Sequence, residues 1–150
     1  MLDSGVRRSE VASLKWSAIS PLHVLTVIGK GKKERQVKLT DFSLLPLERW
    51  KAYNPHSFIF VGITKDRMQV TNQPIHYRSI YNMINNIGLQ LGMQLSPHSL
   101  RRTMATDMAN SGTNPVTIRD DMGHSNIATT SIYLKDSDAI ERRRKMKRSY

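Results

Sequence analysis

One segment with alternating side chains, interrupted by a glycine- and lysine-rich turn, constrains the fold of this 150-residue chain most strongly. Val24 to Ile28 is rich in β-branched residues, and Arg35 to Leu39 alternates polar and apolar residues. The turn between them reads Gly29-Lys30-Gly31-Lys32-Lys33. Two β-rich runs joined by a short turn with glycines predict an antiparallel β-hairpin with a basic tip.

The segments around this hairpin have apolar residues at helical spacing. We expect helices over 9–16, 41–53, 75–93, 98–110, from 115 onward, and 126–134. Ser4 or Ser9 is expected to cap the first helix, and Asp41 or Ser43 the second. Phe58 to Val61 is predicted to be a short buried strand and Thr64 to Pro74 a loop, and 136–150 a basic helix or tail. The fold class is therefore α+β, a mostly helical domain with a small antiparallel hairpin at one side.

Length and charge narrow the class of function. A chain of this length forms about one domain with a sizeable core. The net charge of +11 indicates a polyanionic partner, with nucleic acid as the first candidate and an acidic membrane surface as the second. A merely basic surface would give the same charge. The absence of cysteine excludes disulfides and thiolate metal sites, and fits a cytosolic protein.

The most informative chemistry lies in the last third of the chain. His98 and Arg101 are three residues apart and follow Pro97, so a helix would place them on one face near its N-terminus. His124 follows a glycine at an expected helix end, and Tyr133 lies nine residues farther on. A helix N-terminus attracts anions. Several anion-binding donors with one phenol suggest chemistry on a phosphodiester.

Two further candidates lie earlier. Arg7 precedes Glu10 by three residues, so the carboxylate can orient the guanidinium. Lys30 stands between two glycines, which let the backbone approach a ligand closely. On spacing alone, a solvated surface arginine and a solubilising turn lysine are the favoured interpretations.

Five motifs, taken in order, resemble the tyrosine recombinase (phage integrase) family. They are Gly5-Val6-Arg7-Arg8-Ser9-Glu10, Ile28-Gly29-Lys30-Gly31-Lys32-Lys33-Glu34-Arg35, His98-Ser99-Leu100-Arg101-Arg102-Thr103, Met122-Gly123-His124-Ser125, and Tyr133. Each motif alone is weakly specific, but their order, residue types and intervals together match the family.

The resemblance implies a covalent mechanism on DNA. Tyr133 matches the nucleophile that attacks the scissile phosphate, giving a 3′-phosphotyrosine and a free 5′-hydroxyl. Arg7 and Arg101 match the arginine pair that binds the non-bridging oxygens. Lys30 matches the hairpin lysine assigned as general acid to the leaving oxygen.

The resemblance also implies supporting groups and partners. His98 and His124 match the two histidine positions, and Glu10 matches the acidic position after the first arginine. Lys32, Lys33, Arg35 and Arg102 are expected to bind DNA. The implied partners are double-stranded DNA and other copies of the full-length chain, assembled as a tetramer on paired sites. No cofactor, metal or membrane is expected, and the protein is expected to be cytoplasmic and encoded by a bacterium or a phage.

The pattern departs from the family at the N-terminus. Family members carry further catalytic-domain helices and a DNA-clamping domain before the first arginine, and neither fits ahead of Gly5. We therefore expect residues 1–150 to form an N-terminally truncated catalytic domain that ends in a basic tail from about residue 136. Two other functions remain open: a type IB topoisomerase-like relaxing enzyme, and a DNA-binding or regulatory remnant without cleavage activity.

Overall fold

Eleven short elements make up the part of the chain that the structure describes. The computed structural model describes residues 1–64, 66 and 69–123, apart from the side chain of Lys30. The elements are, in order, α1 (Arg8–Ser13), η1 (Trp16–Ala18), β1 (Val24–Ile28), η2 (Lys30–Lys32), β2 (Glu34–Lys38), α2 (Asp41–Lys51), β3 (Val61–Ile63), β4 (Val70–Pro74), α3 (Tyr77–Gln90), α4 (Pro97–Asn110) and α5 (Pro115–Met122). The expected segments 126–134 and 136–150 lie outside the described residues.

The predicted hairpin is present. β1 and β2 pair antiparallel, with Leu25 opposite Val37 and Val27 opposite Arg35. Side chains two residues apart share a face of a strand. Leu25, Val27 and Val37 are buried, so this face of the hairpin packs inward. Arg35 lies on the same face.

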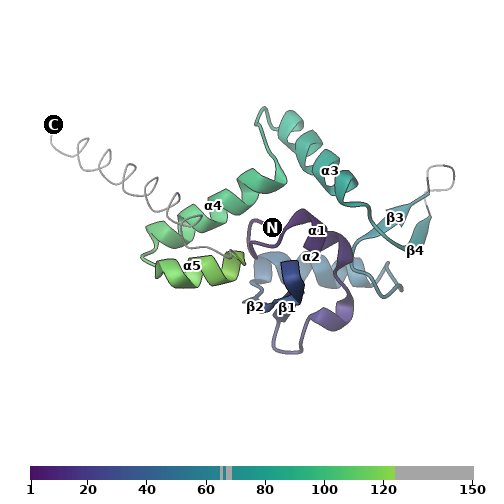
Figure 1. The fold of residues 1–150 in the computed structure, drawn as a ribbon. Coiled ribbons are helices and arrows are strands. Elements are labelled where there is room, and N and C mark those ends of the chain that lie inside the picture. The colour runs from purple at the N-terminus through teal and green to yellow at the C-terminus, as the bar shows by residue number, and fades with distance from the viewer. Residues whose placement is uncertain (65, 67–68, 124–150) are drawn as a thin grey trace.

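The hairpin, α1 and α2 enclose the larger core. Val11, Leu25, Val27, Leu44 and Ile59 are buried together, with Trp50 half-buried against them. The Trp50 Nε1–H donates to the Ile59 carbonyl at 2.6 Å, which ties α2 to the segment before β3. Figure 1 shows α1, α2 and the hairpin in the middle of the molecule, with α3 and β3–β4 to one side and α4–α5 to the other.

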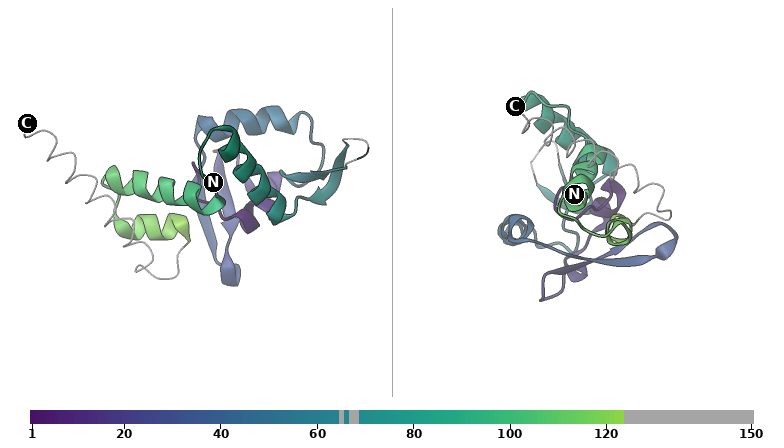
Figure 2. Two further views of the ribbon diagram at one scale, coloured as in Figure 1. Left: turned by 90° about the horizontal axis from the view of Figure 1, so that it is seen from above. Right: turned by 90° about the vertical axis from the view of Figure 1, so that its left-hand side faces the viewer.

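A smaller core lies between α4 and α5, which run side by side in both figures (Figures 1 and 2). Ala105, Ile118 and Met122 are fully buried there. Gly5 joins this core to the larger one, because a Cβ at Gly5 would lie 2.7 Å from the Met104 sulfur and 3.1 Å from the Met122 sulfur. The N-terminal segment that leads to Arg7 therefore packs directly on α4 and α5.

Helix starts follow local side-chain chemistry. In α4 the Ser96 hydroxyl accepts from the Ser99 N–H at 3.0 Å, and Pro97 occupies the first turn as expected. Asn114 caps α5 by accepting from the Val116 N–H at 2.8 Å. His76 caps α3, because its Nδ1 accepts from the Arg78 N–H at 3.2 Å.

Several boundaries differ from the prediction. The first helix is capped by Glu10, whose carboxylate accepts from the Arg7 N–H at 2.7 Å, rather than by Ser4 or Ser9. The predicted loop 64–74 is wrong over Val70–Pro74, which forms β4 and pairs with β3. The polar sequence there shows no alternation because most of this strand is exposed.

The N-terminus of α2 is also stabilised differently. The Asp3 carboxylate accepts from the Thr40 N–H at 3.2 Å and from the Ser43 hydroxyl at 2.7 Å. Asp3, which is far from α2 in the sequence, therefore caps this helix in place of Asp41 or Ser43. Among the helices of the described ranges, none has both the length and the apolar content of a membrane span.

Replacement of Gly88 by alanine tests the contact between α3 and the segment that leads to α4. Alanine normally stabilises a helix interior by about 1 kcal/mol relative to glycine. A Cβ at Gly88 would however lie 2.6 Å from the Met93 carbonyl oxygen and 2.9 Å from the Leu95 nitrogen, both of them backbone atoms. We expect Gly88→Ala to lower the free energy of unfolding by about 1–3 kcal/mol, measured by urea denaturation.

Asn86→Ala is the matched control, because Asn86 is an exposed residue of the same helix. It should stabilise the chain by up to about 0.7 kcal/mol. A Gly88→Ala variant that is as stable as Asn86→Ala would show that the backbone contact is absent.

Candidate functional site

The site is built around the carboxylate of Glu10. Glu10 lies in the first turn of α1, with only 6% of its surface exposed. Its two oxygens accept from the Arg7 N–H at 2.7 Å and from Arg7 Nη1 at 2.8 Å. One side chain therefore both caps the helix and fixes the guanidinium of its N-cap residue.

Arg35 binds the same carboxylate from the hairpin. Its Nη2 donates to Glu10 Oε2 at 2.7 Å and its Nη1 to Oε1 at 3.1 Å, the paired geometry in which arginine binds carboxylates most strongly. Its Nε donates to the Asp121 carbonyl in α5 at 2.9 Å. Arg35 therefore joins the hairpin to both α1 and α5.

Three arginines bind three successive carbonyls at the C-terminus of α5. Arg35 Nε donates to the carbonyl of Asp121. Arg101 Nη2 donates to the carbonyl of Met122 at 3.0 Å, and Arg7 Nη2 donates to the carbonyl of Gly123 at 2.6 Å. The last carbonyls of a helix have no partner within the helix and carry its negative end. Guanidinium groups satisfy these carbonyls, so the side chains and the helix end fix one another.

Gly123 is required at this helix end. Its φ of +61° is left-handed, as in helices that stop at a glycine. A Cβ there would lie 3.0 Å from Arg35 Nη1 and 3.1 Å from Arg7 Nη1. The absence of a side chain lets two guanidinium groups approach the backbone directly before His124.

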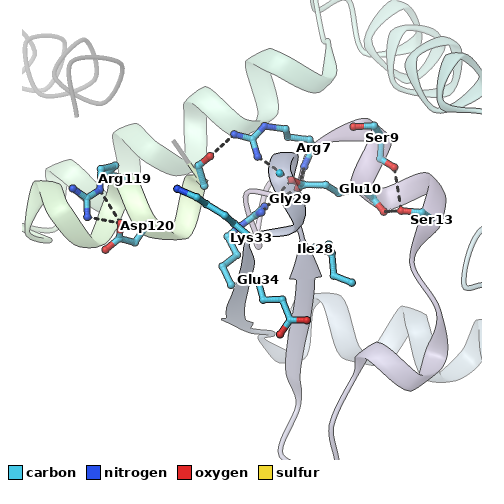
Figure 3. Close-up of a pocket in the computed structure, with 13 residues that line it drawn as sticks. Arg7, Ser9, Glu10, Ser13, Ile28, Gly29, Lys33, Glu34, Arg119 and Asp120 are labelled. Atoms are coloured by element: carbon cyan, nitrogen blue, oxygen red, sulfur yellow. Dashed lines mark hydrogen bonds and ion pairs between the residues drawn. The ribbon is translucent and has the colours of Figure 1, made fainter. Parts of the chain in front are cut away.

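A cavity of about 1160 Å³ opens beside this cluster, between α1, the hairpin and α5. Figure 3 shows Arg7 and Glu10 against one another, with Lys33 projecting from the hairpin turn on one side and Arg119 and Asp120 on α5. Arg119 pairs with Asp120 at 2.6 Å, so their charges largely cancel.

Arg7 borders this cavity and has hydrogen-bond donors that no described residue occupies. Its side chain is 34% exposed and lines the cavity. Of the five N–H donors of a guanidinium, its side chain uses two within the described part of the chain, one to Glu10 and one to Gly123. The exposed edge of Arg7 is thus able to bind an anion.

The pKa values of the Glu10 and Asp121 carboxyl groups are shifted in opposite directions. Burial alone would raise the pKa of Glu10, but hydrogen bonds from Arg35 and Arg7 outweigh it and lower the pKa to about 2. Burial raises the pKa of Asp121, and the neighbouring Asp120 adds to this effect while Arg35 opposes it. Glu10 is therefore a firmly ionised partner for both arginines.

The structure brings together some of the residues singled out from sequence. Arg7, Glu10, Arg35 and Arg101 meet at the end of α5, as described above. His98 lies one turn before Arg101 on α4 and is exposed, whereas Arg101 is buried. The positions of His124, Tyr133 and the Lys30 side chain lie outside the described residues, so their roles stay predictions.

The expected DNA contacts fall into two groups. Lys32, Lys33 and Arg102 are exposed, the first two at the hairpin turn and the third on α4. Arg35 instead points inward, with 11% of its side chain exposed. Within the described residues, no cluster of three or more histidines and carboxylates is arranged to hold a metal ion.

Replacement of Glu10 by glutamine tests the electrostatic role of this carboxylate. Because the pKa in the folded state is about 2, below the ordinary value of 4.5, ionised Glu10 stabilises the fold above about pH 5, and this stability is lost as the pH falls toward 2. The shift corresponds to about 3 kcal/mol.

We expect Glu10→Gln to be less stable than the wild-type chain at pH 7 and to lose much less stability on acidification. Urea denaturation at a series of pH values measures both effects. Parallel stability curves for the two chains between about pH 5 and pH 2 would contradict the assignment.

Comparison with known proteins shows which family the chain belongs to. The chain is 32% identical over 137 residues to a tyrosine recombinase of Pseudothermotoga lettingae, covering 87% of this chain and 45% of that protein. The fold is similar to the crystal structure of XerA recombinase, with a TM-score of 0.76 and 26% identity over 99% of this chain and 55% of the other.

A second structure has the same fold at lower identity. The Tn1549 transposon integrase, solved in complex with circular intermediate DNA, aligns with a TM-score of 0.73 and 21% identity over 95% of this chain and 56% of the integrase. The chain thus spans about half the length of the relatives that it matches.

The model of the phage integrase family matches residues 1–139, almost the whole chain. The α+β fold agrees with this match. The chain belongs to the phage integrase family, which includes the tyrosine recombinases.

Proposed function

We propose that this chain is the catalytic part of an enzyme that cleaves and rejoins DNA strands in site-specific recombination. The observation that carries the proposal is the convergence of Arg7 and Arg101 on the C-terminus of α5, directly before His124. Two cationic side chains from distant parts of the sequence are held at one place, next to the segment that leads to Tyr133.

The reaction begins with the Tyr133 hydroxyl. Its oxygen attacks the scissile phosphorus, the bond from phosphorus to the 5′-oxygen breaks, and a 3′-phosphotyrosine forms. Lys30 gives a proton to the leaving 5′-oxygen. Since the covalent bond retains the energy of the phosphodiester, a 5′-hydroxyl from another strand reverses the step, and strands are exchanged without ATP.

The arginines stabilise the transition state. Attack adds negative charge to the non-bridging oxygens, and fixed guanidinium donors bind that charge better than the ground state. Arg7 lines the cavity, and its orientation is set by Glu10 before any ligand arrives. A tyrosine hydroxyl has an ordinary pKa of about 10, so nearby cations and a histidine must help it lose its proton.

DNA is the partner that the charge favours. The chain carries a net charge of +11, and its exposed lysines Lys32 and Lys33 flank the cavity at the hairpin turn. The similar transposon integrase was solved on DNA. We also propose that the full-length protein acts as a homotetramer on paired sites, since exchange requires two duplexes.

A nicked suicide duplex tests the nucleophile. The probe is a pool of duplexes randomised around a nick, so that cleavage releases a short strand and traps the protein on DNA. We expect the wild-type chain to form a covalent product that survives denaturing electrophoresis and Tyr133→Phe to form none. Product from Tyr133→Phe would contradict the assignment.

The same assay separates the alternatives. Trapped product with exchange between two duplexes supports a recombinase, whereas product without exchange supports a relaxing enzyme of the topoisomerase type. DNA binding without any covalent product would overturn the proposal in favour of a non-cleaving remnant.

Lys30→Ala tests the general acid. A 5′-sulfur leaving group needs no proton, so removal of the acid should matter less for it than for oxygen. We expect Lys30→Ala to slow cleavage of an ordinary duplex by at least about 100-fold and to slow cleavage of the sulfur-substituted duplex much less. Equal losses on both duplexes would exclude Lys30 as the acid.

A further inference from the structure

Among the four residues expected to bind DNA, Arg35 has surroundings that are unlike those of a DNA contact. It lies on the inward face of β2 with Val37, opposite the buried Val27. Lys32 and Lys33, three and two residues earlier, are exposed. A side chain on the buried face of a hairpin is directed into the protein rather than toward a partner.

The donors of Arg35 are largely occupied inside the protein. Nε, Nη1 and Nη2 each donate one hydrogen bond, to Asp121 and to the two oxygens of Glu10. Three of its five N–H groups are therefore used, and its side chain is 11% exposed. Arg7, which shares Glu10, is 34% exposed and faces the cavity.

The bonds of Arg35 link three parts of the site. The hairpin carries the turn with Lys30, α1 carries Glu10 at its first turn, and α5 ends directly before His124. Because Glu10 also holds Arg7 at 2.8 Å, a change at Arg35 is passed to Arg7 through one shared carboxylate.

We propose that Arg35 is a positioning residue for the phosphoryl transfer, acting on Arg7 through Glu10 and on the end of α5 through the Asp121 carbonyl, and not a DNA contact. This inference rests on the proposed function. Removal of Arg35 leaves Glu10 with one guanidinium in place of two, so the orientation of Arg7 loosens. Misplacement of a catalytic group by about 1 Å costs about 100-fold in rate.

Substitutions at Arg35 separate positioning from binding. Arg35→Gln removes the charge and the paired hydrogen bonds, whereas Arg35→Lys keeps the charge and loses the paired geometry. Arg49→Gln is the matched control, since Arg49 is an exposed arginine in the last turn of α2, away from the cavity. Lys33→Gln is the comparison for a side chain expected to contact DNA.

Two quantities are measured for each variant. One is the dissociation constant for a 30-base-pair duplex of mixed sequence and its dependence on salt. The other is the single-turnover rate of covalent product formation on saturating nicked duplex pool. Thermal unfolding and circular dichroism show that each variant is folded under the assay conditions.

We expect Arg35→Gln to bind the duplex within about twofold of wild type, with the same salt dependence, and to form covalent product about 10- to 100-fold more slowly. Arg35→Lys should restore part of the rate, and Arg49→Gln should match wild type in both measurements. Lys33→Gln should bind more weakly, with a shallower salt dependence.

A double variant tests the route through Glu10. Because Arg35 also binds the Asp121 carbonyl, we expect the loss of rate in the Glu10→Gln/Arg35→Gln chain to be smaller than the product of the two single losses, yet larger than the loss in Glu10→Gln. Additive losses would show that Arg35 acts separately. Weaker binding with a shallower salt dependence and an unchanged rate in Arg35→Gln would show instead that Arg35 contacts DNA.

The failure of the proposed function has a different signature. If the wild-type chain forms no covalent product, the function is wrong, and with it any role of Arg35 in the reaction. The pairing of Arg35 with Glu10 is then tested by NMR titration of the Glu10 carboxyl carbon. The pKa of Glu10 should be higher in Arg35→Gln than in wild type, and an unchanged pKa would show that the Arg35–Glu10 pair is absent.

Discussion

The arrangement of the site depends on one buried carboxylate. Glu10 accepts four hydrogen bonds, two from Arg7 and two from Arg35. A buried charge without partners is strongly unfavourable, whereas one bound by two guanidinium groups is stable and holds them in place. Arg7 lies at the start of α1 and Arg35 lies in the hairpin. By binding both arginines, Glu10 therefore holds the start of α1 against the hairpin.

The second constraint is the end of α5. Its last carbonyls carry about half a negative charge in total, and three arginines are arranged around them with the Glu10 carboxylate and the nearby Asp121 carboxyl. Three positive charges against two full and one half negative charge leave this cluster slightly positive. The bonds that hold the fold together here therefore also create a place where a phosphate is attracted, and they do so next to the chain that continues to His124 and Tyr133.

Sequence patterns predicted the hairpin and the later helices because their signals are local. Alternation, glycine turns and the proline in the first turn of α4 act over a few residues. The β4 strand was missed because its exposed, polar sequence has no alternation. The helix cap from Asp3 was missed because it depends on contacts across 37 residues. Arg35 lies on the buried face of the hairpin, which the alternation of Arg35, Val37 and Leu39 in the sequence could have indicated.

The central claim is that the groups gathered around the end of α5 act on one phosphate. A crystal structure of Tyr133→Phe bound to a duplex carrying its cleavage site tests this claim most directly. We expect Arg7 and Arg101 to donate to the non-bridging oxygens of a single phosphate, with the ring of residue 133 in line with the bond to the 5′-oxygen. A duplex bound on another face, with no phosphate within hydrogen-bond distance of either arginine, would contradict it.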